Sequence, residues 1–216
     1  MFESKRLVGK FGSSGDYGYV WPSKIINAAG ISIIENAASN RNFWEQWHLN
    51  FGFNRFDFYT KDKFKLRYRI MPFALHSTVY GLTQWNLSLC ESIKTGTFVF
   101  VTDQIYTDKV DFSPSGGTLA NTIIMTRLSL RNRESVLAHE LIHVYQYESF
   151  SGINTFLNKP KKKLKINSNW FKIYDNIFYT DFNDLYLSGF KVLYNSYESD
   201  FFEKEAYWYQ NLYIKK

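Results

Sequence analysis

The sequence has a single cysteine, Cys90, among its 216 residues. One cysteine cannot form a disulfide bond within the chain, and it cannot supply the several thiolates of a cysteine-ligated zinc site. The sequence thus excludes disulfide-stapled scaffolds and cysteine-based zinc domains. We predict that Cys90 is a buried structural thiol, which fits a reducing compartment without requiring one.

Long apolar segments are also missing. Residues 1–10 contain no apolar core of signal-peptide length, and no stretch approaches the roughly 18 apolar residues that a membrane span needs. We therefore expect a soluble chain without a transmembrane segment, cytoplasmic by default. A chain that had lost its targeting segment would look the same.

What the chain has in abundance is aromatic side chains and a basic excess. Aromatic residues make up 19% of the sequence, and the formal net charge is +6. So many aromatic residues bury large areas, which predicts a folded core rather than a disordered chain. Much of the excess charge lies in the run Lys159–Lys165, which is typical of a solvated loop. No nucleic-acid module accompanies this run, so we expect no nucleic-acid partner.

Periodicity divides the first two thirds of the chain into helices and strands. The glycine- and tyrosine-rich residues 1–22 predict an extended arm or a short hairpin. Apolar spacing predicts a helix over 24–40. Residues 42–48 either continue this helix or form a second short one. Two period-two runs, at 51–59 and 63–70, predict a hairpin. Two short strands are predicted at 97–101 and 121–125, with a loop at 113–117 between them.

The last third is predominantly helical. One predicted helix begins near Asn132, a good N-cap, and ends near Gly152, and a final helix covers about 202–213. The chain shows neither an internal repeat nor a convincing domain boundary. The order of elements predicts a single α+β domain over residues 1–216, with an N-terminal arm of about 1–22 and a small β-sheet packed beside a helix pair.

The most informative motif is His139-Glu140-Leu141-Ile142-His143, an H-E-x-x-H sequence on a predicted helix. Residues i and i+4 share one helix face, so His139 and His143 can direct two imidazoles at one point. Glu140 between them lies where a carboxylate can reach a water molecule at a metal. This pattern predicts that His139 and His143 bind Zn²⁺ and that Glu140 is the general base of a hydrolase.

A catalytic zinc ion usually has three protein ligands. The other two histidines, His48 and His76, precede the motif, which excludes the pattern H-E-x-x-H-x-x-G-x-x-H. The third ligand should therefore be a downstream carboxylate, although Glu148 is expected to point away from the metal face. The candidates are Glu148, Glu198, Asp200, Glu203 and Glu205.

The segment Glu203-Lys204-Glu205-Ala206 resembles the E-x-x-A pattern of gluzincin metallopeptidases, in which a glutamate from a later helix completes H-E-x-x-H. The resemblance implies a zincin-like fold and Glu203 as the third zinc ligand, with Ala206 allowing close helix approach. The chain departs from the pattern at Tyr207, where several such families have an aspartate that supports a ligand histidine. Residues 95–210 also look like a group of largely uncharacterised bacterial H-E-L-x-H-x-x-Q metallopeptidases.

These observations predict a zinc-dependent metallopeptidase that acts on a peptide or protein substrate, with Glu140 taking the proton of the attacking water. The oligomeric state stays open. Two alternatives also remain, a non-catalytic zinc-stabilised binding or assembly module and a protease-like effector or toxin domain. The sequence does not choose the group that stabilises the oxyanion from the candidates Tyr145, Tyr147, His76, Tyr207 and Arg127.

Overall fold

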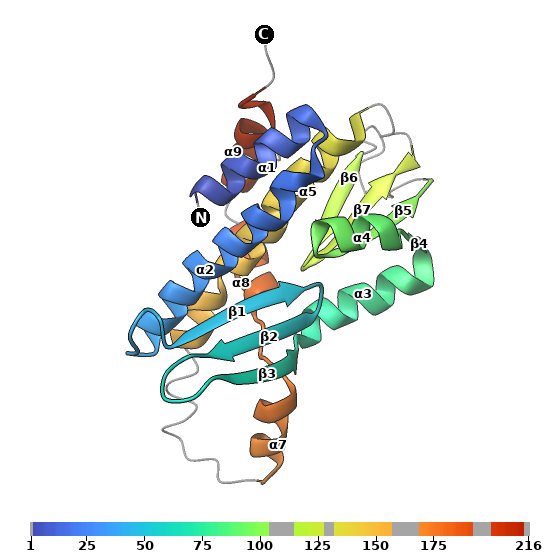
Figure 1. Ribbon diagram of the computed structural model, residues 1–216. Helices are drawn as coiled ribbons and strands as arrows, with labels where there is room; N and C mark the ends of the chain where they lie inside the picture. Colours follow the sequence, from blue (N-terminus) through green and yellow to red (C-terminus); the bar gives the residue numbers. More distant parts are fainter. Residues whose placement is uncertain (1, 104–114, 128–131, 157–168, 192–199, 214–216) are drawn as a thin grey trace.

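The protein has a mixed α+β fold, seen in a computed structural model that describes residues 2–103, 115–127, 132–156, 169–191 and 200–213 (Figure 1). The predicted fold class is confirmed. The run at 159–165 and Glu198 lie outside the described residues. No helix within the described ranges is long and apolar enough to cross a membrane.

Four helices pack together and hold most of the core. They are α1 (Phe2–Ser14), α2 (Val20–Ala38), α5 (Arg133–Ser149) and α9 (Phe201–Asn211), with a short 3₁₀ turn, Tyr17–Tyr19, between the first two. In Figure 1, α5 runs behind α1 and α2, and α9 lies beside α1 near the C-terminus. The remaining helices are α3 (Pro72–Gln84), α4 (Leu89–Thr95), α7 (Asn169–Ile177) and α8 (Asn183–Lys191).

The expected arm or hairpin at the N-terminus is wrong, because most of these residues form helix α1. Glycine disfavours a helix interior, but here two glycines allow tight packing. A Cβ at Gly9 would collide with the backbone carbonyl of Tyr209 in α9, and a Cβ at Gly12 would lie 2.7 Å from the Cβ of Ala138 in α5. Tertiary contact therefore overrides local propensity.

The strands form two sheets rather than one. The first is antiparallel with the order β1-β2-β3, from β1 (Gln46–Phe51), β2 (Asn54–Tyr59) and β3 (Lys65–Ile70). The second has the order β4-β5-β7-β6, from β4 (Asn86–Leu87), β5 (Phe98–Thr102), β6 (Gly116–Leu119) and β7 (Thr122–Thr126). In the second sheet β5 and β7 are parallel, and β6 is an antiparallel edge strand beside α5.

Two sequence expectations fail in these sheets. Residues 46–51, partly expected to be helical, are strand β1, and the expected loop glycines Gly116 and Gly117 begin β6. The predicted hairpin is confirmed as β2–β3, and the strands predicted at 97–101 and 121–125 are β5 and β7, each one residue later.

The sheet β1–β3 buries its polar face. Arg55 and Asp57 have no exposed surface and form an ion pair of 2.9 Å, and Arg55 also pairs with Glu35 of α2 at 2.7 Å. His48 lies 3.0 Å from the same Glu35 carboxylate. Since these charged groups satisfy one another against α2, the alternate residues of the strands face outward.

Cys90 is exposed, so the prediction of a buried thiol is wrong.

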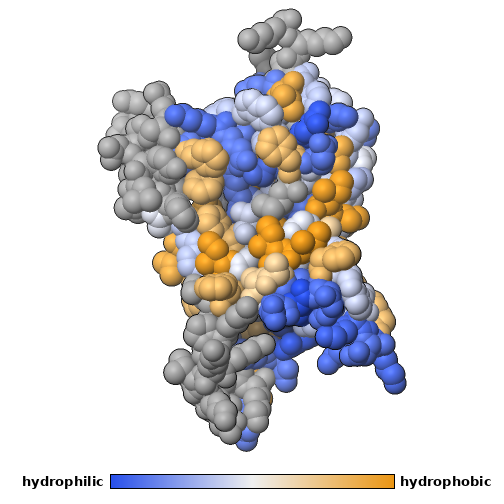
Figure 2. Space-filling view, turned by 90° about the vertical axis from the view of Figure 1, so that its left-hand side faces the viewer, coloured by the Kyte–Doolittle hydropathy of each residue, from blue (hydrophilic) through white to orange (hydrophobic). Residues whose placement is uncertain are grey.

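Some large apolar side chains are exposed as well. Figure 2 shows hydrophobic residues gathered in a band across one side of the molecule. The exposed isoleucines of α2 are Ile25, Ile26, Ile33 and Ile34.

Candidate metal centre

Helix α5 carries both motif histidines and is buried over most of its length, from Leu137 to Glu148. The observed helix, Arg133–Ser149, agrees with the predicted one. Its first residue is tied to α4 by an ion pair between Arg133 and Glu91. Helix α9 packs against α5, and Ala206 is fully buried in their shared core. Because α5 is anchored along its length, its side chains have defined directions.

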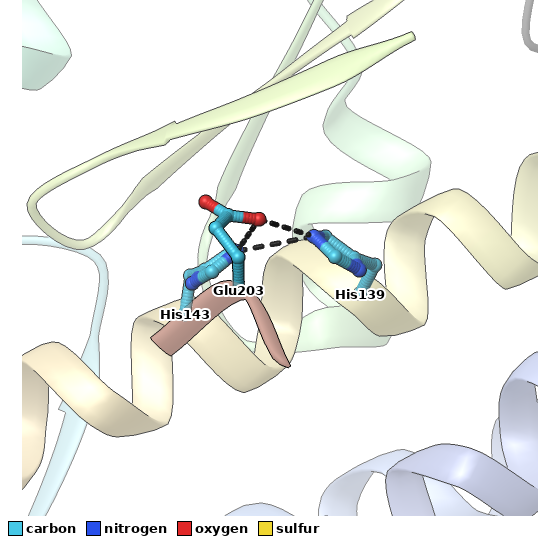
Figure 3. A group of neighbouring side chains, drawn as sticks. All are labelled: His139, His143 and Glu203. Atoms are coloured by element: carbon cyan, nitrogen blue, oxygen red, sulfur yellow. Dashed lines mark hydrogen bonds and ion pairs between the residues drawn. The ribbon is translucent and has the colours of Figure 1, made fainter. Parts of the chain in front are cut away.

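Three side chains from these two helices converge on one point (Figure 3). The Nε2 atoms of His139 and His143 lie 3.1 Å apart. One carboxylate oxygen of Glu203 is 3.2 Å from the first nitrogen and 3.3 Å from the second. All three residues are buried. The structure thus brings together the residues that the motif and the E-x-x-A segment predict as ligands.

The size of this triangle fits a metal ion. A tetrahedral site with bonds of about 2.0–2.1 Å has ligand atoms about 3.3 Å apart, and the three distances here are 3.1, 3.2 and 3.3 Å. Two imidazole nitrogens and one carboxylate oxygen suit zinc and other borderline divalent metals. His139, His143 and Glu203 therefore form a group that could hold a metal ion.

Two glutamines fix the ring orientation of the histidines. The Nδ1–H of His143 donates a hydrogen bond of 2.7 Å to Oε1 of Gln146, and that of His139 donates one of 3.1 Å to Oε1 of Gln210. With each Nδ1 proton directed at an amide, both Nε2 atoms face Glu203. The sequence offers no aspartate for this role. Instead, one amide lies one turn later on α5 and the other comes from α9.

Gln146 is itself held in one orientation. Its two N–H groups donate to the Phe202 carbonyl at 2.9 Å and to the Glu205 carboxylate at 2.8 Å, so its oxygen must face His143. Glu205 also forms a 2.6 Å ion pair with Lys5 of α1. The two neighbouring glutamates of α9 thus have different places, Glu203 at the histidines and Glu205 behind them.

The protonation of His143 reflects its acidic neighbours. Burial would lower its pKa, but the hydrogen bond to Glu203 and the negative charges of Glu140 and Glu203 outweigh burial and raise the pKa above the usual value. A site that favours a proton on a buried imidazole is one that attracts positive charge. A divalent cation satisfies the same carboxylates.

Glu140 is positioned by the edge strand. The hydroxyl of Thr118 in β6 lies 2.7 Å from Glu140 Oε2, and a Cβ at Gly116 would lie 2.9 Å from Glu140 Oε1. Thr118 therefore orients the carboxylate, and Gly116 leaves room for it. Sequence reasoning missed both residues, because the Gly116–Gly117 pair indicated a loop.

The remaining candidate ligands serve elsewhere. Asp200 caps α9 by accepting a hydrogen bond from the Phe202 N–H. Glu148 is fully enclosed by polar side chains, and its carboxylate accepts hydrogen bonds from three asparagines. Those asparagines are Asn27, Asn50 and Asn121.

Of the five candidates for oxyanion stabilisation, Tyr207 contacts a candidate ligand. Its ring centroid is 4.5 Å from that of His139, and 45% of Tyr207 is exposed. The buried hydroxyls of Tyr145 and Tyr147 bond to Ser23 and Asp181. The other two candidates, His76 and Arg127, are exposed, and Arg127 pairs with Asp103.

Comparisons with models of protein families, with curated proteins and with solved structures gave no match.

Proposed function

We propose that the protein is a zinc-dependent hydrolase, specifically a metallopeptidase, with His139, His143 and Glu203 as the metal ligands. One observation carries the proposal. Three electron-rich atoms lie within 3.3 Å of one another, while both histidine Nδ1 protons are directed at glutamines. Such a cluster favours positive charge among its three atoms, which a divalent cation supplies.

The residues around the metal group support the chemistry. When bound, a zinc ion lowers the pKa of water and polarises a carbonyl. Glu140, oriented by Thr118, accepts a proton from the attacking water and delivers it to the leaving amine. The half-exposed phenol of Tyr207 donates a hydrogen bond to the oxygen that gains negative charge.

The neighbouring edge strand favours a peptide as the substrate. Strand β6 borders α5 and contains Thr118, and its second edge pairs with no strand among the described residues. An extended peptide can add to such an edge through main-chain hydrogen bonds. At Gly117 an added Cβ would meet nothing within 4 Å, so side chains do not obstruct that point.

Metal content tests the ligand set. The chain, purified under metal-replete conditions, should retain about one zinc ion per chain, while His139→Ala and Glu203→Ala should retain little. His76→Ala, a change at an exposed histidine of α3, is the matched control and should retain the metal. Absence of zinc from the wild-type chain would overturn the metal site.

Catalysis needs a separate test. Glu140→Gln should keep zinc and lose peptide hydrolysis by a factor of at least about 10², measured with a library of fluorogenic peptides. If wild type and Glu140→Gln bind zinc equally and neither cleaves any peptide of the library, the alternative of a zinc-stabilised binding module replaces the metallopeptidase.

A further inference from the structure

The sheet β1–β3 presents an apolar outer face. Its polar residues point inward, so the alternate positions point away from α2. The outer face, as we call it, consists of Trp47, Leu49, Phe51, Phe56, Phe58, Leu66 and Tyr68. Cross-strand pairing places these residues in rows, with Trp47, Phe58 and Leu66 in one and Leu49, Phe56 and Tyr68 in the next.

This orientation is fixed by the inner face. The Arg55 guanidinium lies against the ring of Tyr179 at 3.9 Å, besides its ion pairs with Glu35 and Asp57. A sheet turned over would move Arg55 and Asp57 away from α2 and leave Glu35 under apolar side chains without Arg55, which is strongly unfavourable. The apolar residues are therefore outward in the stable fold.

The outer face is incompletely covered. Among the described residues, the main contacts of the sheet are with α2, on the inner face, and with α7, along β3. At one end of the outer face, the ring of Phe51 packs against that of Phe98 in β5 at 5.6 Å. Leu66 is 54% exposed and Tyr68 46% exposed. Exposed apolar faces of this kind usually mark an interaction site.

The adjoining hairpin tip extends the apolar surface and adds positive charge. Phe64, between β2 and β3, is 72% exposed, and its ring lies 6.4 Å from that of Phe58. The exposed lysines Lys61 and Lys63 flank it in the turn, beside the acidic residue Asp62. Lys61 also lies 3.2 Å from the carboxylate of Glu45. The surface thus combines exposed aromatic rings with a cationic rim.

Size and charge together select the partner. Three strands of six residues span about 20 Å by 14 Å, or roughly 300 Å², whereas a stable dimer buries about 800 Å² on each partner. The face is therefore small for a second copy of this chain, which would also bring its own lysines. A lipid surface needs no such area, because aromatic side chains insert singly at the headgroup level and lysines pair with anionic lipids.

We propose that the outer face and the β2–β3 hairpin tip bind the surface of an anionic phospholipid bilayer. Phe64 and Leu66 enter the headgroup region, and Lys61 and Lys63 of the turn contact the phosphates. The proposal is independent of the metal centre. It explains why this sheet exposes apolar residues that another domain would bury.

Co-sedimentation of the full chain with vesicles tests the proposal. The chain should bind vesicles of phosphatidylcholine mixed with phosphatidylglycerol and not vesicles of phosphatidylcholine alone, and salt should weaken binding. Lys63→Gln should reduce the partition coefficient about fivefold, and Leu66→Ser about tenfold. Lys94→Gln and Leu89→Ser, at exposed positions of α4, are the matched controls and should bind like wild type.

Three results would overturn the proposal. One is equal binding to neutral and anionic vesicles, or none to either. Another is equal weakening by the control variants, which would indicate a nonspecific effect. The third is that Leu66→Ser leaves vesicle binding unchanged and instead disrupts another complex. That complex would be either a dimer seen in sedimentation velocity or a complex with single-stranded oligouridylate.

Discussion

The Nδ1–H of His143 donates a 2.7 Å hydrogen bond to Oε1 of Gln146, one turn later on the same helix. This amide takes the place of the missing aspartate, and it is locked because its N–H groups bind Glu205 and the Phe202 carbonyl. The position of the His143 imidazole therefore depends on contacts that reach α9 and, through Lys5, α1.

Gln146→Leu should weaken zinc affinity about 10- to 100-fold, since the histidine loses the acceptor that orients it. Competition with a chromophoric chelator measures the change. Gln146→Glu keeps an acceptor toward His143 but should not restore the affinity, because its carboxylate would lie against the Glu205 carboxylate and the Phe202 carbonyl. Unchanged affinity in Gln146→Leu would contradict the role of the amide without affecting the ligand assignment.

The two glutamates of α9 should differ in a graded way. Glu203→Ala removes a ligand and should abolish tight zinc binding, while Glu205→Gln keeps a hydrogen-bond acceptor for Gln146 and should cost no more than about tenfold in affinity. The same chelator competition compares them. A reversed order would show that Glu205 is the ligand.

Tyr207→Phe should leave zinc affinity unchanged and lower kcat about 10²-fold, because the ring keeps its contact with His139 while the donor to the oxyanion is lost. Peptide hydrolysis and metal titration of the same preparation separate the two effects. Tyr147→Phe removes a hydroxyl that bonds to Asp181 and should not alter kcat. If Tyr207→Phe retains full activity, another group stabilises the oxyanion.

Gly9→Ala should destabilise the fold by about 2 kcal/mol, since the new methyl group meets the Tyr209 carbonyl and separates α1 from α9. Gly189→Ala in α8, where a Cβ would meet nothing within 4 Å, should instead stabilise the fold by about 0.5–1 kcal/mol through helix propensity. Urea denaturation measures both. Equal effects of the two substitutions would contradict close packing at Gly9.

Stability should fall in acid because of the buried ion cluster. Burial opposes ionisation of Glu35, but Arg55 and His48 outweigh it and hold the Glu35 pKa well below its usual 4.5. The unfolded chain therefore binds this proton first, so the contribution of Glu35 is complete above about pH 4.5 and is lost progressively as the pH falls below it.

Glu35→Gln should accordingly cost about 3 kcal/mol at pH 7, because Arg55 loses a buried partner. The difference from wild type should shrink between about pH 4.5 and 3. Urea denaturation over this range measures it, with Glu3→Gln, at an exposed pair with Arg6, as the control. A difference that stays constant with pH would contradict the lowered pKa of Glu35.

The local signals of the sequence were reliable where the periodic pattern was long. The motif helix was expected from Asn132 to near Gly152 and is observed as α5, Arg133–Ser149. The spacing of His139 and His143 also determined that their imidazoles share one helix face, since helix geometry alone places residues i and i+4 together. The choice of Glu203 depended on a resemblance, and the structure brings this residue to the histidines.

The tertiary structure decided what depends on contacts between distant residues. Helix α1 forms despite its glycines because α5 and α9 pack closely on it. Gln210 meets His139 only through the approach of α9 to α5, and Thr118 meets Glu140 only because β6 lies beside the helix. Alternation showed the two faces of β2 and β3, but the ion pairs of Arg55 with Glu35 and Asp57 determined which face is buried. A sequence pattern gives the period of an element, whereas its partner determines which side is inside.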